Sequence, residues 1–261
     1  MRVDLHNHTT LCNHASGSMD EYIQKAIELG IDIYGFSEHA PMKNFCDGYR
    51  LELKDKQLYE NSVKQLQEKY QDQIKILLGY EVDYLEGDYI LDEIKDSSVD
   101  YLIGSVHYLG TWGFDNPEFI GVYENKDIDL IWEEYFEAIK QMAQTNYFNI
   151  VGHLDLIKIF KYLPKKEITS IATQALQEIK KSNMAIEINA AGFRKPIQEQ
   201  YPSIELLKEA FKLNIPITFS SDAHSIEQIG FRYEDAVGIA KNVGYDHFVY
   251  FEKRNEKKVS L

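Results

Sequence analysis

The chain has 261 residues, 44% of them hydrophobic, and a formal net charge of −14. This length fits one α/β barrel of about 250 residues better than two domains, so a single domain over residues 1–261 is expected. The lack of a long apolar stretch excludes a membrane span, the lack of a basic face argues against nucleic-acid binding, and no secretory leader is recognisable. With only Cys12 and Cys46 as thiols, a reduced cytoplasmic protein is expected.

Strand and helix patterns alternate along the whole chain. Strands are expected at residues 3–6, 33–37, 74–82, 101–106, 149–152, 185–189, 217–220 and 248–251. Helices are expected at residues 18–29, 58–70, 91–94, 128–143, 168–180, 202–213 and 233–243. Short β-branched strands spaced about 30 residues apart predict a parallel sheet covered by helices. The longest expected loop, residues 108–126, is typical of a lid or binding loop.

Side chains that can bind metal follow most of these strands. An open sheet gathers its ligand at one switch point, whereas a closed barrel brings every strand end around one mouth. Because such side chains follow strands one to five and strand seven, the pattern predicts a closed α/β barrel. The residues concerned are His6, His8, His14, His39, Glu81, His107, His153, Asp222 and His224.

These nine side chains predict a multinuclear metal centre. Neutral imidazole is the commonest metal ligand, and His6 and His8 alternate by two, so both can face the mouth. A carboxylate such as Glu81 at the end of an apolar strand is costly unless it binds metal or pairs with a lysine. Catalytic zinc takes about three protein ligands, so nine ligands divide into three sites, and Zn, Fe and Mn all suit them. Cys12 either adds a thiolate or packs as a small loop residue.

The expected charge of the centre favours phosphate chemistry. Three divalent ions outweigh the charges of Glu81, Asp222 and a bridging hydroxide, which suits a phosphate-monoester dianion better than a neutral amide. Arg194 follows the one strand without a metal ligand, and its planar fork can bind phosphate through two hydrogen bonds. Lys158, after His153, is a second candidate. The alternative for both cations is a solvated surface charge.

Taken together, these motifs resemble the polymerase and histidinol phosphatase (PHP) superfamily over essentially the whole chain, and within it the histidinol-phosphate phosphatase family. The resemblance implies a distorted (β/α)7 TIM-like barrel with three divalent metal ions, acting on L-histidinol phosphate in histidine biosynthesis. It places His6, His8, Glu81 and Asp222 at a first metal, Glu81, His107 and His153 at a second, and His14, His39 and His224 at a third. The motifs are His6-Asn7-His8, His14, Ser37-Glu38-His39, Gly79-Tyr80-Glu81, Gly104-Ser105-Val106-His107, Trp112-Gly113-Phe114-Asp115, Gly152-His153-Leu154-Asp155, the stretch from Glu187 to Pro196, and Ser221-Asp222-Ala223-His224.

The mechanistic hypothesis is hydrolysis by a metal-bound hydroxide that attacks phosphorus in line. Arg194, with Lys158 as a second candidate, would stabilise the phosphoryl oxygens, and Asp222 or a metal-bound group would manage the proton. The cationic end of an amino-alcohol substrate needs a carboxylate, and the candidates by position are Asp115, Asp155 and Glu86.

Three other functions remain as alternatives. A nuclease or phosphodiesterase of the same superfamily would use the same ligands, although the acidic chain lacks a basic stripe. A metal-dependent amidohydrolase also begins with His-x-His on a barrel strand, although Glu81 stands in the bridging position here. A non-catalytic metal-binding module would bind metal without turning over any phosphoester. The oligomeric state does not follow from the sequence.

Overall fold

The computed structural model describes residues 1–261, and its centre is a sheet of seven parallel strands. The strand order is β1-β2-β3-β4-β7-β8-β9, so each barrel strand lies beside the barrel strand that precedes it in the chain. These strands are β1 (Val3–Asp4), β2 (Ile33–His39), β3 (Lys75–Asp83), β4 (Tyr101–Ser105), β7 (Ile150–Val151), β8 (Ala185–Asn189) and β9 (Ile217–Ser220).

The sheet closes on itself where the segment that follows β1 meets β9 and the segment that follows β9. Leu5 N donates to Phe219 O at 3.2 Å and His8 N donates to Ala223 O at 2.9 Å. Asn7 also forms a parallel bridge with Ala223. The predicted seven-stranded barrel is confirmed, and its closure brings all the strand carboxyl ends around one mouth.

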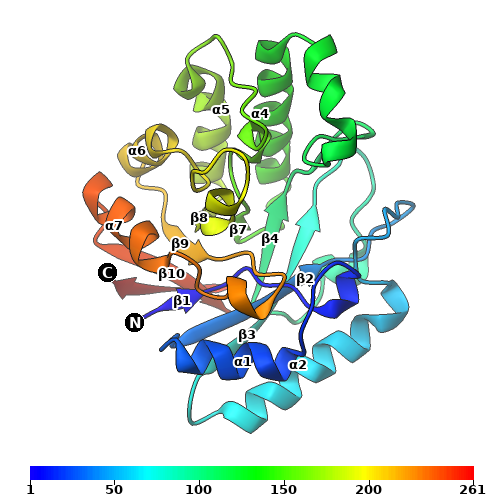
Figure 1. The fold of residues 1–261 in the computed structure, drawn as a ribbon, viewed down its shortest axis with the longest axis vertical. Coiled ribbons are helices and arrows are strands. Elements are labelled where there is room, and N and C mark those ends of the chain that lie inside the picture. The colour runs from blue at the N-terminus through cyan, green and yellow to red at the C-terminus, as the bar shows by residue number, and fades with distance from the viewer.

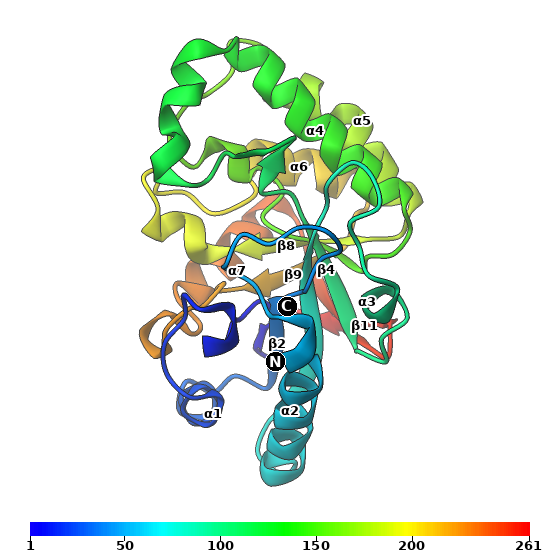
Figure 2. The same cartoon turned by 90° about the vertical axis from the view of Figure 1, so that its right-hand side faces the viewer.

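Helices follow the strands and cover the outside of the barrel (Figure 1). They are α1 (Met19–Glu28), α2 (Lys56–Tyr70), α3 (Asp92–Lys95), α4 (Ile128–Gln144), α5 (Ile168–Lys181), α6 (Ile204–Lys212) and α7 (Tyr233–Val243). A capping box begins α1, because Ser18 accepts from Glu21 N while the Glu21 side chain accepts from Ser18 N. Figure 2 shows α4 and α5 side by side at one end of the molecule and α2 at the other. None of these helices has the length and apolar character needed to span a bilayer.

The barrel interior is filled by side chains, and among them the buried ring of Tyr101 packs against two glycines, one in β2 and one in β3. A Cβ on Gly35 would lie 2.0 Å from the Tyr101 hydroxyl, and one on Gly79 would lie 2.5 Å from its ring, so only glycine leaves room there. The hydroxyl donates to Leu5 O at 2.6 Å. Tyr101 therefore holds the chain just before His6.

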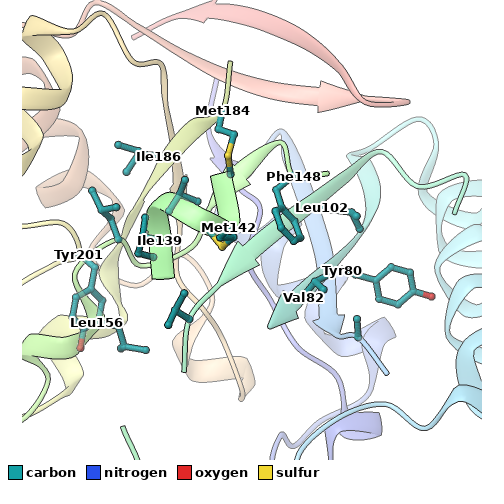
Figure 3. Close-up of a cluster of buried hydrophobic side chains, with 14 of the residues drawn as sticks. Tyr80, Val82, Leu102, Ile139, Met142, Phe148, Leu156, Met184, Ile186 and Tyr201 are labelled. Carbon is teal, nitrogen blue, oxygen red and sulfur yellow. The ribbon is translucent and has the colours of Figure 1, made fainter. Parts of the chain in front are cut away.

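A second, larger part of the core lies between the strands and the outer helices (Figure 3). Ile139 and Met142 of α4 pack in this layer with Leu102 of β4 and with Phe148. All four side chains are at most 5% exposed. This packing fixes α4 against the barrel and leaves the mouth to be shaped by loops.

Two segments differ from the expected secondary structure. The terminal strand β10 (His247–Glu252) lies outside the barrel and pairs antiparallel with an unexpected strand, β11 (Asn255–Ser260). The turn between them places Lys253 and Arg254 at φ 49° and 66°, a conformation that favours Asn-Gly, so Lys-Arg gave no turn signal. The expected loop 108–126 contains the hairpin β5 (Tyr108–Leu109) and β6 (Trp112–Gly113), followed by a 3₁₀ segment, Pro117–Asn125.

Candidate metal centre

The structure brings all nine predicted ligands together at the mouth of the barrel. His6, His8, Glu81 and His153 are at most 2% exposed, and the others are more accessible. Several sets of three side chains place their ligand atoms within 4.8 Å of one another, which is close enough for a shared metal ion. They are His6-His8-Glu81, Glu81-His107-His153, His8-His39-His224, Cys12-His14-His224 and His8-Cys12-Glu38.

Glu81 lies between two groups of imidazoles. Its Oε2 is 3.2 Å from His6 Nε2 and 2.9 Å from His39 Nδ1. Its Oε1 is 3.0 Å from His153 Nε2 and 3.7 Å from His107 Nε2. Burial alone would raise the pKa of this carboxyl, but the surrounding imidazoles hold it well below its usual range. A carboxylate whose two oxygens face separate ligand groups is suited to bridging two metal ions, and no lysine takes part in these contacts.

The side chains expected at the third metal fall into two of these groups. His39 and His224 share a group with His8, whereas His14 shares one with Cys12 and His224. The Cys12 thiol donates to Thr9 O at 3.0 Å, and burial raises its pKa. The His14 and His39 rings are 5.4 Å apart between centroids.

Buried carboxylates that the sequence analysis missed orient three of the imidazoles. His6 Nδ1 lies 3.0 Å from Glu187, and His8 Nδ1 lies 3.3 Å from Glu38. His107 Nδ1 contacts Asp83 in the same way. Because each carboxylate fixes one ring nitrogen as a donor, the other nitrogen is left as a lone pair for a metal. The missed signal is a carboxylate inside an apolar strand, which is costly unless it is paired.

Three buried ring nitrogens at this centre are left without a hydrogen-bond partner, namely Nδ1 of His153, Nε2 of His6 and Nε2 of His8. The two Nε2 atoms face the carboxylates of Glu81 and Asp222. A buried polar atom without a partner is expensive, and metal coordination would satisfy both Nε2 atoms. The side chains at this site therefore fit a metal centre.

The backbone near this centre is held in uncommon conformations. Asp222 has φ 52° and His153 has φ 22°, values that non-glycine residues rarely adopt. Such residues cluster at functional sites, where surrounding contacts hold them in place. For Asp222 these contacts include Arg194, whose Nη2 donates at 2.9 Å to both Ser221 O and Asp222 O.

A cavity of about 620 Å³ opens directly above the ligands. Arg194 and Asp115 both line it, as the sequence predicts for substrate contacts. Arg194 Nη1 is buried and has no partner, so one arm of the guanidinium is unused. Asp115 is half-buried, and burial raises its pKa. The expected loop 108–126 also contributes to the wall through Gly113, Asn116, Pro117 and Phe119.

The other predicted substrate contacts do not reach this cavity. Lys158 is 2% exposed and lies 3.0 Å from Asp155 and 2.9 Å from Glu199, so it is a buried ion pair and not a free cation. Asp155 also accepts from Ser203 N at 2.8 Å. Glu86 is exposed at the surface and lies outside the cavity wall. Tyr201, which the sequence analysis did not single out, does line the cavity, with a buried hydroxyl that has no partner.

Comparison with known proteins agrees with this geometry. The family model for the PHP domain matches residues 4–191. A probable histidinol-phosphatase from Deinococcus radiodurans is 36% identical over 92% of this chain and 93% of its own length. The histidinol-phosphatase from Bacillus subtilis is 30% identical over 88% and 96%, respectively.

A solved structure shares the fold. The histidinol phosphate phosphatase from Lactococcus lactis subsp. lactis, complexed with zinc, L-histidinol and phosphate, superimposes with a TM-score of 0.80 over 98% of both chains, at 24% identity. The family model and the two relatives match most of this chain, and its metal-ligand motifs lie together at one barrel mouth. The chain therefore belongs to the PHP domain family, in the branch that contains the histidinol-phosphatases.

Proposed function

We propose that this protein hydrolyses L-histidinol phosphate to L-histidinol and phosphate, using three divalent metal ions of zinc, iron or manganese. The relatives named for this activity support the substrate, and the zinc in the Lactococcus structure supports metal use. The proposed ligands are the nine side chains identified in the sequence. Both cysteines are free, which fits the proposed cytoplasmic location.

The observation that carries this proposal is the arrangement of Glu81 among the imidazoles. One carboxylate oxygen faces His6 and His39, and the other faces His107 and His153. When bound, divalent ions at such a site supply Lewis acidity and a deprotonated water at neutral pH. Glu81 would hold two of these ions close together, as in two-metal phosphatases.

The remaining chemistry belongs to side chains around the cavity. Arg194 uses Nη2 for the backbone of Ser221 and Asp222, and its free Nη1 donates to a phosphoryl oxygen. Asp222 Oδ2 accepts from Asn189 Nδ2 at 3.2 Å, so its carboxylate is held in place to accept the proton of the attacking water. Asp115 accepts from the substrate ammonium group. The other carboxylates that line the cavity each contact an arginine or a histidine, whereas Asp115 forms no such ion pair or hydrogen bond.

The test is phosphate release from L-histidinol phosphate by protein loaded in turn with Zn, Mn and Fe. p-Nitrophenyl phosphate and bis-p-nitrophenyl phosphate serve as the monoester and diester comparisons. A kcat/KM for histidinol phosphate far above both supports the proposal. Faster turnover of the diester would favour a phosphodiesterase instead, and metal binding without turnover of any ester would favour a binding module.

A further inference from the structure

Arg50 is a cation at the cavity wall that the proposed mechanism does not use. It lies in the loop after β2 and is 5% exposed. Its donors are already occupied by the protein: Nη2 lies 3.0 Å from Asp83 Oδ2, Nε lies 3.1 Å from Asp47 Oδ1, and Nη1 lies 3.3 Å from Ala40 O. An arginine with every nitrogen engaged is poorly placed to bind substrate phosphate.

One branch of this network leads to the metal centre. Asp83 is 2% exposed and accepts from His107 Nδ1, which leaves His107 Nε2 directed at Glu81 Oε1, 3.7 Å away. Arg50 therefore holds the Asp83 carboxylate in place, and Asp83 in turn orients the His107 imidazole.

The other branch leads to the hairpin at the cavity wall. Asp47 Oδ2, which also contacts Arg50, accepts from the Tyr108 hydroxyl at 2.8 Å. Tyr108 pairs with Gly113 in the β5–β6 hairpin, two residues before Asp115. The position of the hairpin that carries Asp115 is therefore tied to the same guanidinium.

We propose that Arg50 is a positioning residue that links the Glu81-His107-His153 group to the hairpin that carries Asp115. Through Asp83 it holds His107 in the orientation and tautomer that a metal requires. Through Asp47 and Tyr108 it sets the distance between the metals and the ammonium-binding wall. The second role rests on the proposed function, whereas the first concerns metal binding alone.

Two possible roles of Arg50, as a positive charge and as a positioning residue, predict opposite effects of its removal on metal affinity. If Arg50 acted only as a positive charge near the metals, its removal would reduce repulsion and tighten binding. If it positions His107, its removal must weaken binding. Loss of a partner that orients a metal ligand typically costs about 10–100-fold in metal affinity.

The experiment compares Arg50→Met with Asp83→Asn, Tyr108→Phe and a control, Arg254→Met. Arg254 is half-buried, and it donates to Tyr147 O and Lys95 O and not to the metal centre. Metal affinity is measured by chelator competition with elemental analysis, without substrate. KM is measured with histidinol phosphate and with p-nitrophenyl phosphate.

We expect Arg50→Met and Asp83→Asn to weaken the binding of one metal ion by about 10–100-fold, while Arg254→Met leaves the affinity for every ion unchanged. Tyr108→Phe should keep the metals and raise KM for histidinol phosphate but not for p-nitrophenyl phosphate. Equal or tighter metal binding in Arg50→Met would overturn the proposal. If Arg50→Met does not fold, Arg50→Lys keeps the charge without the fork and must give the same loss. The measurement of metal affinity needs no substrate, so it tests the role of Arg50 at His107 even if histidinol phosphate is not turned over.

Discussion

Replacing Lys158 with Met separates a structural role from the phosphate-binding role that the sequence suggested. Lys158 is 2% exposed and lies 3.0 Å from Asp155, 2.9 Å from Glu199 and 2.8 Å from Gln200 O. Removing one partner of a buried pair costs about 3–5 kcal/mol, because the other charge stays buried without compensation. Asp155 keeps its bond from Ser203 N, and Glu199 is 36% exposed and can regain water, so we expect a value near ~3 kcal/mol.

The assay is urea unfolding of the metal-loaded enzyme, followed by kcat/KM measured well below the unfolding transition. We expect a lower unfolding midpoint at unchanged slope and an unchanged kcat/KM. The control is Lys181→Met, which breaks a pair whose lysine is 76% exposed and should change stability by less than about 1 kcal/mol. A large fall in kcat/KM with an unchanged midpoint would refute this reasoning and return Lys158 to the substrate.

Three further outcomes follow from the same geometry. Arg194→Ala removes a charged hydrogen bond worth about 1.5–3 kcal/mol, so kcat/KM for histidinol phosphate should fall about 10–100-fold, and an unchanged value would exclude its role in phosphate recognition. Asp115→Asn should raise KM for histidinol phosphate and leave p-nitrophenyl phosphate unaffected, whereas equal effects on both substrates would argue against an ammonium contact. Removal of metal with a chelator should abolish activity and lower the unfolding midpoint, since each ion at 100 times its Kd stabilises the fold by about 2.7 kcal/mol. Added zinc should restore both, and an apo protein as stable as the loaded one would show that these side chains do not bind metal tightly.

The barrel and its ligand residues could be predicted because both leave periodic signals in the sequence. Every barrel strand except β8 is followed by a side chain of metal-binding type, and β8 (Ala185–Asn189) and β9 (Ile217–Ser220) have the expected bounds. Strand lengths were less predictable. The strand β7 is two residues long, because the chain leaves regular pairing before His153 and its left-handed backbone.

The partners of the ligands could not be predicted, because a single sequence does not show which buried carboxylate meets which histidine. Glu187 lies 181 residues from His6, and their contact depends on the barrel register. Lys158 shows the converse error. A cation close to a ligand motif resembles a phosphate contact, and the sequence does not show that this one is buried beside Asp155.

Barrel closure brings together metal-binding side chains from the first and the last strand of the barrel. His6 and His8 follow β1, whereas Asp222 and His224 follow β9, so they meet only when these two strands come together. Asp4, 1% exposed, accepts from Ser221 N at 2.9 Å and from the Ser221 hydroxyl at 2.6 Å. These bonds hold the residue next to Asp222, whose φ of 52° needs such support. Metal bound across this junction would therefore stabilise the closed barrel, and the closed barrel would in turn hold the ligands in place.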